Sequence, residues 1–221
     1  MGLVVDAVVF DLDGVLVDSE PVWEQVRRQY VADHGGRWQP DTQQRLMGMS
    51  TGEWAHYLSD ELGVDRTAEQ VSVEVVNEMA TRYAAAVPLV PGADAVVREL
   101  ARSWPLGLAS SSPPRLIEAA LTASGLGESF EVAMSSESVP NGKPAPDIYL
   151  AVAERLGQSP SACVAVEDSS NGVRSADRAG MTVIAVPARE YPLDEDARRR
   201  AALVVDRLDV VTAEAVRTVG S

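Results

Sequence analysis

The chain has 221 residues, 46% of them hydrophobic and 24% charged, which is typical of a globular protein with room for one medium α/β domain and a smaller insert. A formal net charge of −14 argues against nucleic acid or an anionic membrane as the main partner. The single cysteine, Cys163, excludes a disulfide within the chain and fits a reducing compartment. No apolar run reaches the roughly 20 residues that span a bilayer, so we expect a cytoplasmic protein.

The first notable feature is an apolar, β-branched run at residues 4–10, which is typical of a buried parallel strand. It is followed at once by Asp11-Leu12-Asp13-Gly14. Because side chains alternate along an extended segment, Asp11 and Asp13 can lie on one side. Two buried carboxylates this close repel each other unless a cation joins them or one takes a proton. The pattern therefore predicts a metal site and acid–base chemistry at these two residues.

The segment 19–86 contains several helical patterns and no convincing strand. Its two apolar stripes with helical spacing are Val22, Val26 and Tyr30, and then Val71, Val75 and Met79. Pro88 and Pro91 mark the return to a different pattern. We expect residues 19–86 to form a small helical domain and residues 1–18 and 87–221 to form the core domain.

From residue 87 onward, short apolar runs alternate with helical patterns. The predicted strands are 106–109, 131–134, 162–166, 182–186 and 203–205, and the predicted helices are about 93–103, 113–124, 145–157 and 170–179. This alternation predicts a Rossmann-like α/β core, a parallel sheet with helices on both faces. Ligands bind beyond the carboxyl ends of the strands in such sheets. The polar residues that follow the strands are therefore the candidate site residues.

Hydroxyl groups and a lysine follow two of these strands. The second strand leads into Ser110-Ser111-Ser112 and then into two prolines that begin a helical pattern. Hydroxyls and free N–H groups at a helix N-terminus suit a phosphate, although a simple serine cap is the alternative. Lys143 lies between Gly142 and Pro144, on a stiff connection that can hold an ammonium in place. An ordinary surface lysine is the alternative there.

The fourth strand ends in Glu167-Asp168, followed by Ser169. An acidic helix start capped by Asp168 or Ser169 is one interpretation. The other is that these carboxylates join Asp11 and Asp13 at one edge of the sheet. Hard oxygen ligands gathered in this way suit Mg²⁺, with water and a substrate phosphate completing its octahedron.

The combination of motifs resembles the haloacid dehalogenase superfamily. Asp-x-Asp-Gly after the first strand, serine after the second, Gly-Lys-Pro, and Glu-Asp after the fourth occur in the family's order along nearly the whole chain. Residues 142–149 and 166–180 are similar to the subgroup of β-phosphoglucomutases and sugar-phosphate phosphatases, and segment 19–86 resembles its helical cap domain. The resemblance implies an Mg²⁺-dependent phosphatase that acts on a small phosphomonoester, with a sugar phosphate as the expected substrate.

The resemblance also implies a role for each motif residue. Asp11 would attack phosphorus to form an aspartyl-phosphate, and Asp13 would protonate the leaving oxygen and then activate water. The implied phosphate contacts are Ser110, Ser111 and Lys143, and the implied metal ligands are Asp11, Asp13 through its backbone carbonyl, Asp168 and Glu167. Dehalogenation is not expected, because a halide needs no acid to leave and that branch of the family lacks the second aspartate.

The cap turn and the serine motif favour a phosphatase over a mutase. β-Phosphoglucomutases place an arginine shortly after the glycine of the cap turn and a lysine–asparagine pair after the serine motif. Here Gly48 is followed by Met-Ser-Thr-Gly, and Ser112 by Pro-Pro-Arg. The groups that would bind a second phosphate are therefore missing at both places. Arg45 or Arg115 could substitute, which leaves a mutase as the alternative.

Residues at the start and turn of the cap are candidates to set substrate selectivity. Glu20 is expected to contact the substrate, while Trp23, Met47 and Met49 flank the same region and are better explained by helical packing than by substrate contact. The expected partner is a small phosphorylated metabolite, with no nucleic acid and no membrane, and a monomer is favoured. A catalytically idle ligand-binding or interaction protein is the remaining alternative, disfavoured by the complete set of charged residues.

Overall fold

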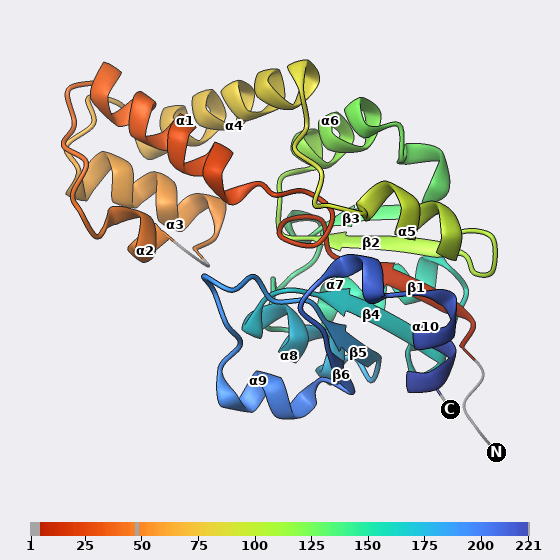
Figure 1. Ribbon diagram of the computed structural model, residues 1–221. Coiled ribbons are helices and arrows are strands. Elements are labelled where there is room, and N and C mark those ends of the chain that lie inside the picture. The colour runs from red at the N-terminus through yellow and green to blue at the C-terminus, as the bar shows by residue number, and fades with distance from the viewer. Residues whose placement is uncertain (1–4, 47–48, 221) are drawn as a thin grey trace.

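A computed structural model describes residues 5–46 and 49–220 of the chain. Its core is a six-stranded, all-parallel sheet with helices on both faces, in the strand order β3-β2-β1-β4-β5-β6 (Figure 1). The strands are β1 (Ala7–Phe10), β2 (Leu106–Ser110), β3 (Val132–Ser135), β4 (Cys163–Glu167), β5 (Thr182–Ala185) and β6 (Leu203–Val204). The predicted α/β sheet is confirmed.

Strand β1 lies at the centre of the sheet, between β2 and β4. Its four residues are all buried, and their side chains alternate between two hydrophobic clusters: Val8 and Phe10 pack in one, Ala7 and Val9 in the other. The chain builds the sheet outward from β1 in one direction through β2 and β3, and then in the other through β4 to β6. Such a reversal of strand order places the ligand-binding crevice at the carboxyl ends of β1 and β4.

The predicted strands differ from the observed ones only at their ends. The run that we expected at residues 4–10 gives a strand that begins at Ala7, and residue 4 lies outside the described residues. The strand expected at 162–166 lies one residue later and includes Glu167. Cys163 is buried within it, as an ordinary core residue of a strand. These shifts leave every predicted polar residue at the same edge of the sheet.

Six helices belong to the sheet-containing part of the structure. They are α5 (Ala93–Leu100), α6 (Pro114–Ser124), α7 (Asp147–Arg155), α8 (Ser170–Arg178), α9 (Glu195–Arg200) and α10 (Ala213–Val219). Ser169 caps α8, because its hydroxyl accepts the backbone N–H of Gly172, so the helix starts close beyond the end of β4. None of the described helices is long and apolar enough to cross a membrane.

Four further helices form a separate layer beside one end of the sheet (Figure 1). This helical layer consists of α1 (Glu20–Asp33), α2 (Thr42–Leu46), α3 (Thr51–His56), which continues as a π-helical turn at Tyr57–Glu61, and α4 (Ala68–Ala85). No strand occurs in residues 20–46 or 49–85, as the sequence predicts. The second predicted stripe, Val71, Val75 and Met79, is fully buried along α4. Helix α4 also packs against α6 of the core.

Two adjacent connections join the helical layer to the sheet. The backbone N–H of Asp18 donates to the carbonyl of Pro88 at 2.8 Å, and Val17 forms an antiparallel bridge with Leu89. The chain therefore enters and leaves the helical layer at one place, next to the Asp11–Gly14 turn. This arrangement positions the start of α1 over the carboxyl ends of the strands.

Candidate active site

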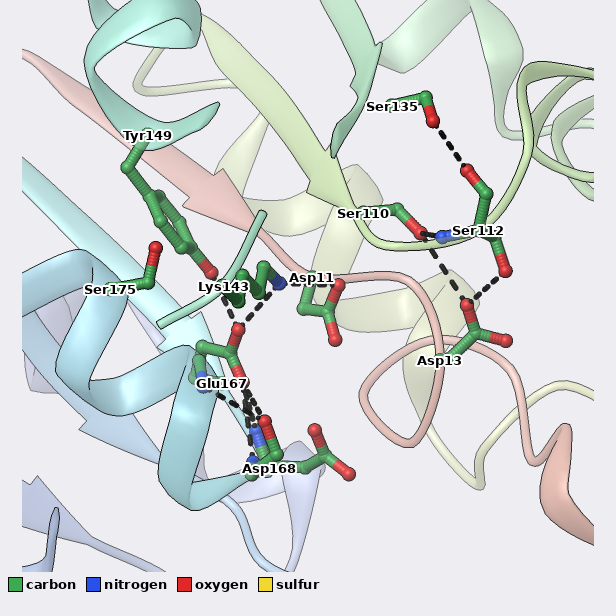
Figure 2. A network of polar contacts seen from close by, with 12 residues as sticks. Asp11, Asp13, Ser110, Ser112, Ser135, Lys143, Tyr149, Glu167, Asp168 and Ser175 are labelled. Carbon is green, nitrogen blue, oxygen red and sulfur yellow. Dashed lines mark hydrogen bonds and ion pairs between the residues drawn. The ribbon is translucent and has the colours of Figure 1, made fainter. Parts of the chain in front are cut away.

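The predicted polar residues meet at the carboxyl ends of three neighbouring strands (Figure 2). Asp11 directly follows β1, Ser110 is the last residue of β2, and Glu167 is the last residue of β4. Lys143 comes from the connection between β3 and α7 and lies between Asp11 and Glu167. The topology that the sequence predicts therefore brings residues more than 150 positions apart into one cluster.

Lys143 is buried between two carboxylates. Its Nζ lies 2.9 Å from Asp11 Oδ1 and 2.6 Å from Glu167 Oε1, and its side chain is only 6% exposed. Burial alone would lower the pKa of Lys143, but the charges of Asp11 and Glu167 outweigh it and hold the pKa above its ordinary value. Lys143 is therefore a fixed cation of the cluster, and the surface-lysine alternative does not describe it.

Glu167 is fully buried, and both of its oxygens are engaged. Oε1 accepts from Lys143 and, at 2.8 Å, from the hydroxyl of Tyr149. Oε2 accepts from the backbone N–H of Asp168 at 3.0 Å and from the N–H and hydroxyl of Ser169, each at 3.2 Å. A Cβ on Gly172 would lie 1.8 Å from this carboxylate, so only glycine lets α8 approach it. Glu167 thus anchors the lysine and the start of α8 together.

Asp11, Glu167 and Asp168 offer carboxylate oxygens that all lie within 4.8 Å of one another. Burial raises the pKa of Asp11 to about 7, with Lys143 opposing the shift and Glu167 adding to it. Burial, together with the charges of Glu167 and Asp11, raises the pKa of Asp168 well above its usual range. Three carboxylates facing one ammonium leave an excess of negative charge, which a divalent cation would balance.

The donor set of this cluster fits Mg²⁺. All of its ligand atoms are hard oxygens, as Mg²⁺ prefers. Gly14 has a φ of +79°, and a Cβ there would lie 2.0 Å from Asp168 Oδ2, so the glycine leaves the space in which this carboxylate sits. The site therefore has both the chemistry and the unmet negative charge of a cation site.

The carboxylate of Asp13 does not join this three-carboxylate cluster. Its Oδ2 accepts hydrogen bonds from Ser112 Oγ at 2.7 Å and Ser110 Oγ at 3.4 Å (Figure 2). The chain turns at Asp13–Gly14 instead of continuing extended, and this directs the Asp13 side chain toward β2. Asp11 and Asp13 therefore have different surroundings, the first beside an ammonium and the second beside hydroxyls.

The three serines after β2 have different roles in the structure. Ser110 is fully buried, and its hydroxyl accepts the backbone N–H of Ser112 at 3.0 Å. Ser111, which the sequence also indicated, is exposed. Ser112 was not among the predicted site residues, although it makes the shorter contact to Asp13 and is itself held by Ser135, whose hydroxyl donates to its carbonyl at 2.7 Å. Its spacing of two from Ser110 was the available signal, because alternate residues share a face.

The residues expected to set selectivity, at the start of the helical layer, have different surroundings. Glu20 is the first residue of α1 and accepts a hydrogen bond from Gln43 Nε2. Burial raises the pKa of Glu20, opposed by Arg27 and assisted by Asp13. Trp23 is buried against Trp54, with ring centroids 5.8 Å apart. Of the two interpretations offered for Trp23, this contact supports helical packing.

The other two residues of this group are methionines. Met49 is partly buried against the main hydrophobic cluster, and Met47 lies outside the described residues, as does Gly48 of the cap turn. Sequence reasoning missed Arg27 altogether. The available signal was a charged residue four positions after Trp23, on the apolar face of α1.

Comparison with known proteins identifies the family. A haloacid dehalogenase-like hydrolase model matches residues 5–180. The chain belongs to this family. It is 35% identical to hexitol phosphatase B of Escherichia coli over 85% of this chain and 86% of that protein. The resemblance inferred from the motifs is therefore confirmed, and with it the assignment of the chain to a family of hydrolases.

Solved structures show the same fold. The crystal structure of CbbY from Rhodobacter sphaeroides in complex with phosphate superposes with a TM-score of 0.85 at 25% identity, covering 96% of this chain and 99% of that one. A putative β-phosphoglucomutase from Thermotoga maritima is 30% identical, with a TM-score of 0.76 and coverage of 93% and 96%. The α/β core with its helical layer is thus shared along nearly the whole length of these proteins.

Proposed function

We propose that the chain is an Mg²⁺-dependent phosphatase that hydrolyses a small phosphomonoester, with a sugar phosphate as the substrate class, through an aspartyl-phosphate intermediate. The observation that carries the proposal is the cluster of Asp11, Glu167 and Asp168 around Lys143 at the centre of the sheet edge. The similarity to hexitol phosphatase B supports the substrate class. A site made only for binding an anion would gain little from these carboxylates.

Asp11 and Asp168 would hold Mg²⁺ directly, together with the backbone carbonyl of Asp13, and Glu167 would act directly or through water. When bound, Mg²⁺ would offset the charge of the phosphate oxygens that approach this acidic cluster. Lys143 would neutralise a further part of that charge, because its ammonium is fixed beside Asp11. Ser110, with Ser111 as the alternative, would donate a hydrogen bond to the phosphate.

Asp11 is the proposed nucleophile. One of its carboxylate oxygens forms a bond to phosphorus while the bond from phosphorus to the sugar oxygen breaks. In the second step a water oxygen attacks the same phosphorus, the bond to Asp11 breaks, and inorganic phosphate leaves. The ion pair with Lys143 favours the ionised form of Asp11 that the first step requires.

Asp13 is the proposed acid and base. It gives a proton to the departing sugar oxygen and later takes one from the attacking water, so that it returns to its starting state. The hydroxyls of Ser110 and Ser112 hold the Asp13 carboxylate away from the three-carboxylate cluster. We propose that residues 19–86 act as a cap domain over residues 1–18 and 87–221, covering this acid and the leaving group.

A phosphosugar mutase is the second candidate, favoured by the similarity to the putative β-phosphoglucomutase. The two activities share every core residue named above and differ in whether water or a sugar hydroxyl accepts the phosphoryl group. A mutase needs a bisphosphate activator and yields an isomer, whereas a phosphatase releases inorganic phosphate from a hexose monophosphate. We expect phosphate release without an activator.

The proposal is tested by hydrolysis of p-nitrophenyl phosphate with and without Mg²⁺, followed by a panel of phosphorylated metabolites scored by kcat/KM. We expect Mg²⁺-dependent phosphate release, with sugar or sugar-alcohol monophosphates as the best substrates. Isomer formation that requires a bisphosphate would favour the mutase. No turnover with Mg²⁺, together with retained ligand binding, would favour the idle binding protein.

A further inference from the structure

Arg27 is a buried cation in the helical layer. It lies on α1 and is only 6% exposed. Its guanidinium carbon is 4.4 Å from the ring centroid of Trp23 on the same helix and 5.0 Å from that of Trp54 on α3. The two indole rings therefore pack against the guanidinium, which fixes its position and its plane.

One buried donor of Arg27 has no partner within the described part of the chain. Its buried Nε has no hydrogen-bond partner there, and no carboxylate of those residues lies within ion-pair distance. Burial lowers the pKa of Arg27 to about 10, opposed by Glu20 and Asp13, so the guanidinium stays charged at neutral pH. Because a buried, unpaired charge is unfavourable, this donor is suited to an oxygen acceptor that arrives with a ligand.

Arg27 and Glu20 both lie on α1, the helix that begins just after the Asp11–Gly14 turn. The charges of Glu20 and Asp13 both act on Arg27. Glu20 lies seven residues before Arg27, two turns earlier on the same face of α1. One face of α1 therefore offers a carboxylate acceptor and, two turns further along, a set of guanidinium donors, and the helix starts close to the Asp11–Gly14 turn, where the leaving group of a phosphomonoester would lie.

We propose that Arg27 and Glu20 form a specificity site that binds the hydroxyl groups of the substrate's leaving group, at the end remote from the phosphate. The proposal deepens the proposed function and rests on it. Arg27 donates to hydroxyl oxygens and Glu20 accepts from hydroxyl hydrogens, a pairing that suits a polyol because each of its hydroxyls is both donor and acceptor. A second phosphate is disfavoured, since it would meet the negative charge of Glu20 together with the single positive charge of Arg27.

The test compares two substrates that share the phosphate but differ in their leaving groups. Glucitol 6-phosphate carries a chain of hydroxyls, whereas p-nitrophenyl phosphate carries none. We expect Arg27→Met to reduce the ratio of kcat/KM for glucitol 6-phosphate to that for p-nitrophenyl phosphate by about 30-fold, the loss typical of a charged hydrogen-bond donor. Glu20→Gln is expected to reduce the same ratio by about 10-fold.

Arg28→Gln is the matched control. It removes the same charge from the adjacent position of α1, where the side chain is 66% exposed and lies 3.9 Å from Glu24. This variant is expected to keep the wild-type ratio. Arg27→Lys retains the charge and much of the stem but loses the planar fork, so we expect a partial loss of the ratio in a protein with a thermal midpoint near that of the wild type.

Three results would overturn the inference. An equal loss for both substrates in Arg27→Met and Arg27→Lys would show that the guanidinium only supports the packing of the two tryptophans. A wild-type preference for a sugar bisphosphate over the monophosphate would show that the site binds a second anion. Wild-type kcat/KM values for both substrates in both variants would show that the substrate does not reach Arg27. Failure of the proposed function is distinguishable, because the wild type would then release no phosphate from either substrate.

Discussion

The two buried cations named above, Lys143 and Arg27, lie in contrasting surroundings. Lys143 is held by Asp11 and Glu167, and Glu167 is itself fixed by Tyr149 and by the first backbone groups beyond β4. Arg27 is held by the faces of two aromatic rings, and its Nε has no partner among the described residues. The first cation is paired with two carboxylates before any ligand binds, and the second is positioned by aromatic rings but lacks a hydrogen-bond partner at its Nε.

The contrast separates two tasks of one enzyme. Phosphoryl transfer needs charges that are already in place when the transition state forms, because reorganising them would raise the barrier. Selecting a leaving group needs donors and acceptors that the correct substrate satisfies and a wrong one leaves unpaired. Lys143 fits the first task for any phosphomonoester, whereas Arg27 fits the second for hydroxylated ones. Changes at Lys143 should therefore affect all substrates, and changes at Arg27 should depend on the substrate.

The largest effect is expected from Lys143→Met. This variant removes the ammonium from Asp11 and Glu167, so the nucleophile and the phosphate lose their fixed positive charge. We expect kcat/KM to fall by about 10³-fold for every substrate, within the range seen when a charge-stabilising group is removed. Steady-state kinetics with p-nitrophenyl phosphate and glucitol 6-phosphate check this, and a loss confined to one of the two would contradict the division of tasks.

Asp13→Asn should give a smaller loss that depends on the leaving group. A sugar alkoxide needs a proton as it departs, so we expect a fall of about 10²-fold for formation of the intermediate from glucitol 6-phosphate. p-Nitrophenolate leaves without one, so single-turnover release of p-nitrophenol should fall by less than about 10-fold. Rapid-mixing measurements distinguish the two. Similar losses for both substrates would remove Asp13 from the role of acid.

Ser112→Ala should give a loss of about 10-fold. The variant removes the 2.7 Å hydrogen bond that orients the Asp13 carboxylate, while the weaker contact at 3.4 Å from Ser110 remains. We expect the loss in kcat for glucitol 6-phosphate to exceed that for p-nitrophenyl phosphate, because the effect acts through Asp13. Combining Ser112→Ala with Asp13→Asn should add little, and additive losses in the double variant would contradict the positioning role.

The smallest effect concerns stability. Burial raises the pKa of Asp11 from 3.8 to about 7, so this group stabilises the metal-free protein below about pH 4 and loses that contribution as the pH rises through 7. We expect the thermal midpoint in EDTA to fall by about 3 °C or more between pH 5 and pH 8. Mg²⁺ should restore stability more at pH 8 than at pH 5. A metal-free Asp11→Asn protein that shows the same fall as the wild type would assign it to other groups.

The sequence predicted the sheet and its acidic edge because both depend on local patterns. Apolar runs flanked by polar turns define β1 and β4 to within a few residues, and the rule for parallel sheets then brings Asp11 and Asp168 to one edge. The absence of strands from the described residues of 19–86 also followed from local patterns, since this segment lacks any strand-like run.

The remaining details depend on contacts between distant segments. The hydrogen bond from Tyr149 to Glu167 requires the position of α7, and the packing of Arg27 on Trp54 requires the mutual orientation of α1 and α3. The direction of the Asp13 side chain depends on the turn at Gly14. The alternation of side chains along an extended segment does not reveal this turn. The bounds of α9 were not predicted, because its polar sequence, Glu-Asp-Ala-Arg-Arg-Arg, has no apolar stripe and the helix begins after the Asp194 cap.

The covalent role of Asp11 is tested most directly by acid quenching of Asp13→Asn during turnover of radiolabelled p-nitrophenyl phosphate with Mg²⁺. Because this variant forms the intermediate from a good leaving group but activates water poorly, we expect close to one labelled phosphate for each protein, on the peptide that contains Asp11 and released by hydroxylamine. The same label should be absent when Asp11→Asn is added. A burst of p-nitrophenol with no labelled protein, or a label on another residue, would contradict the account.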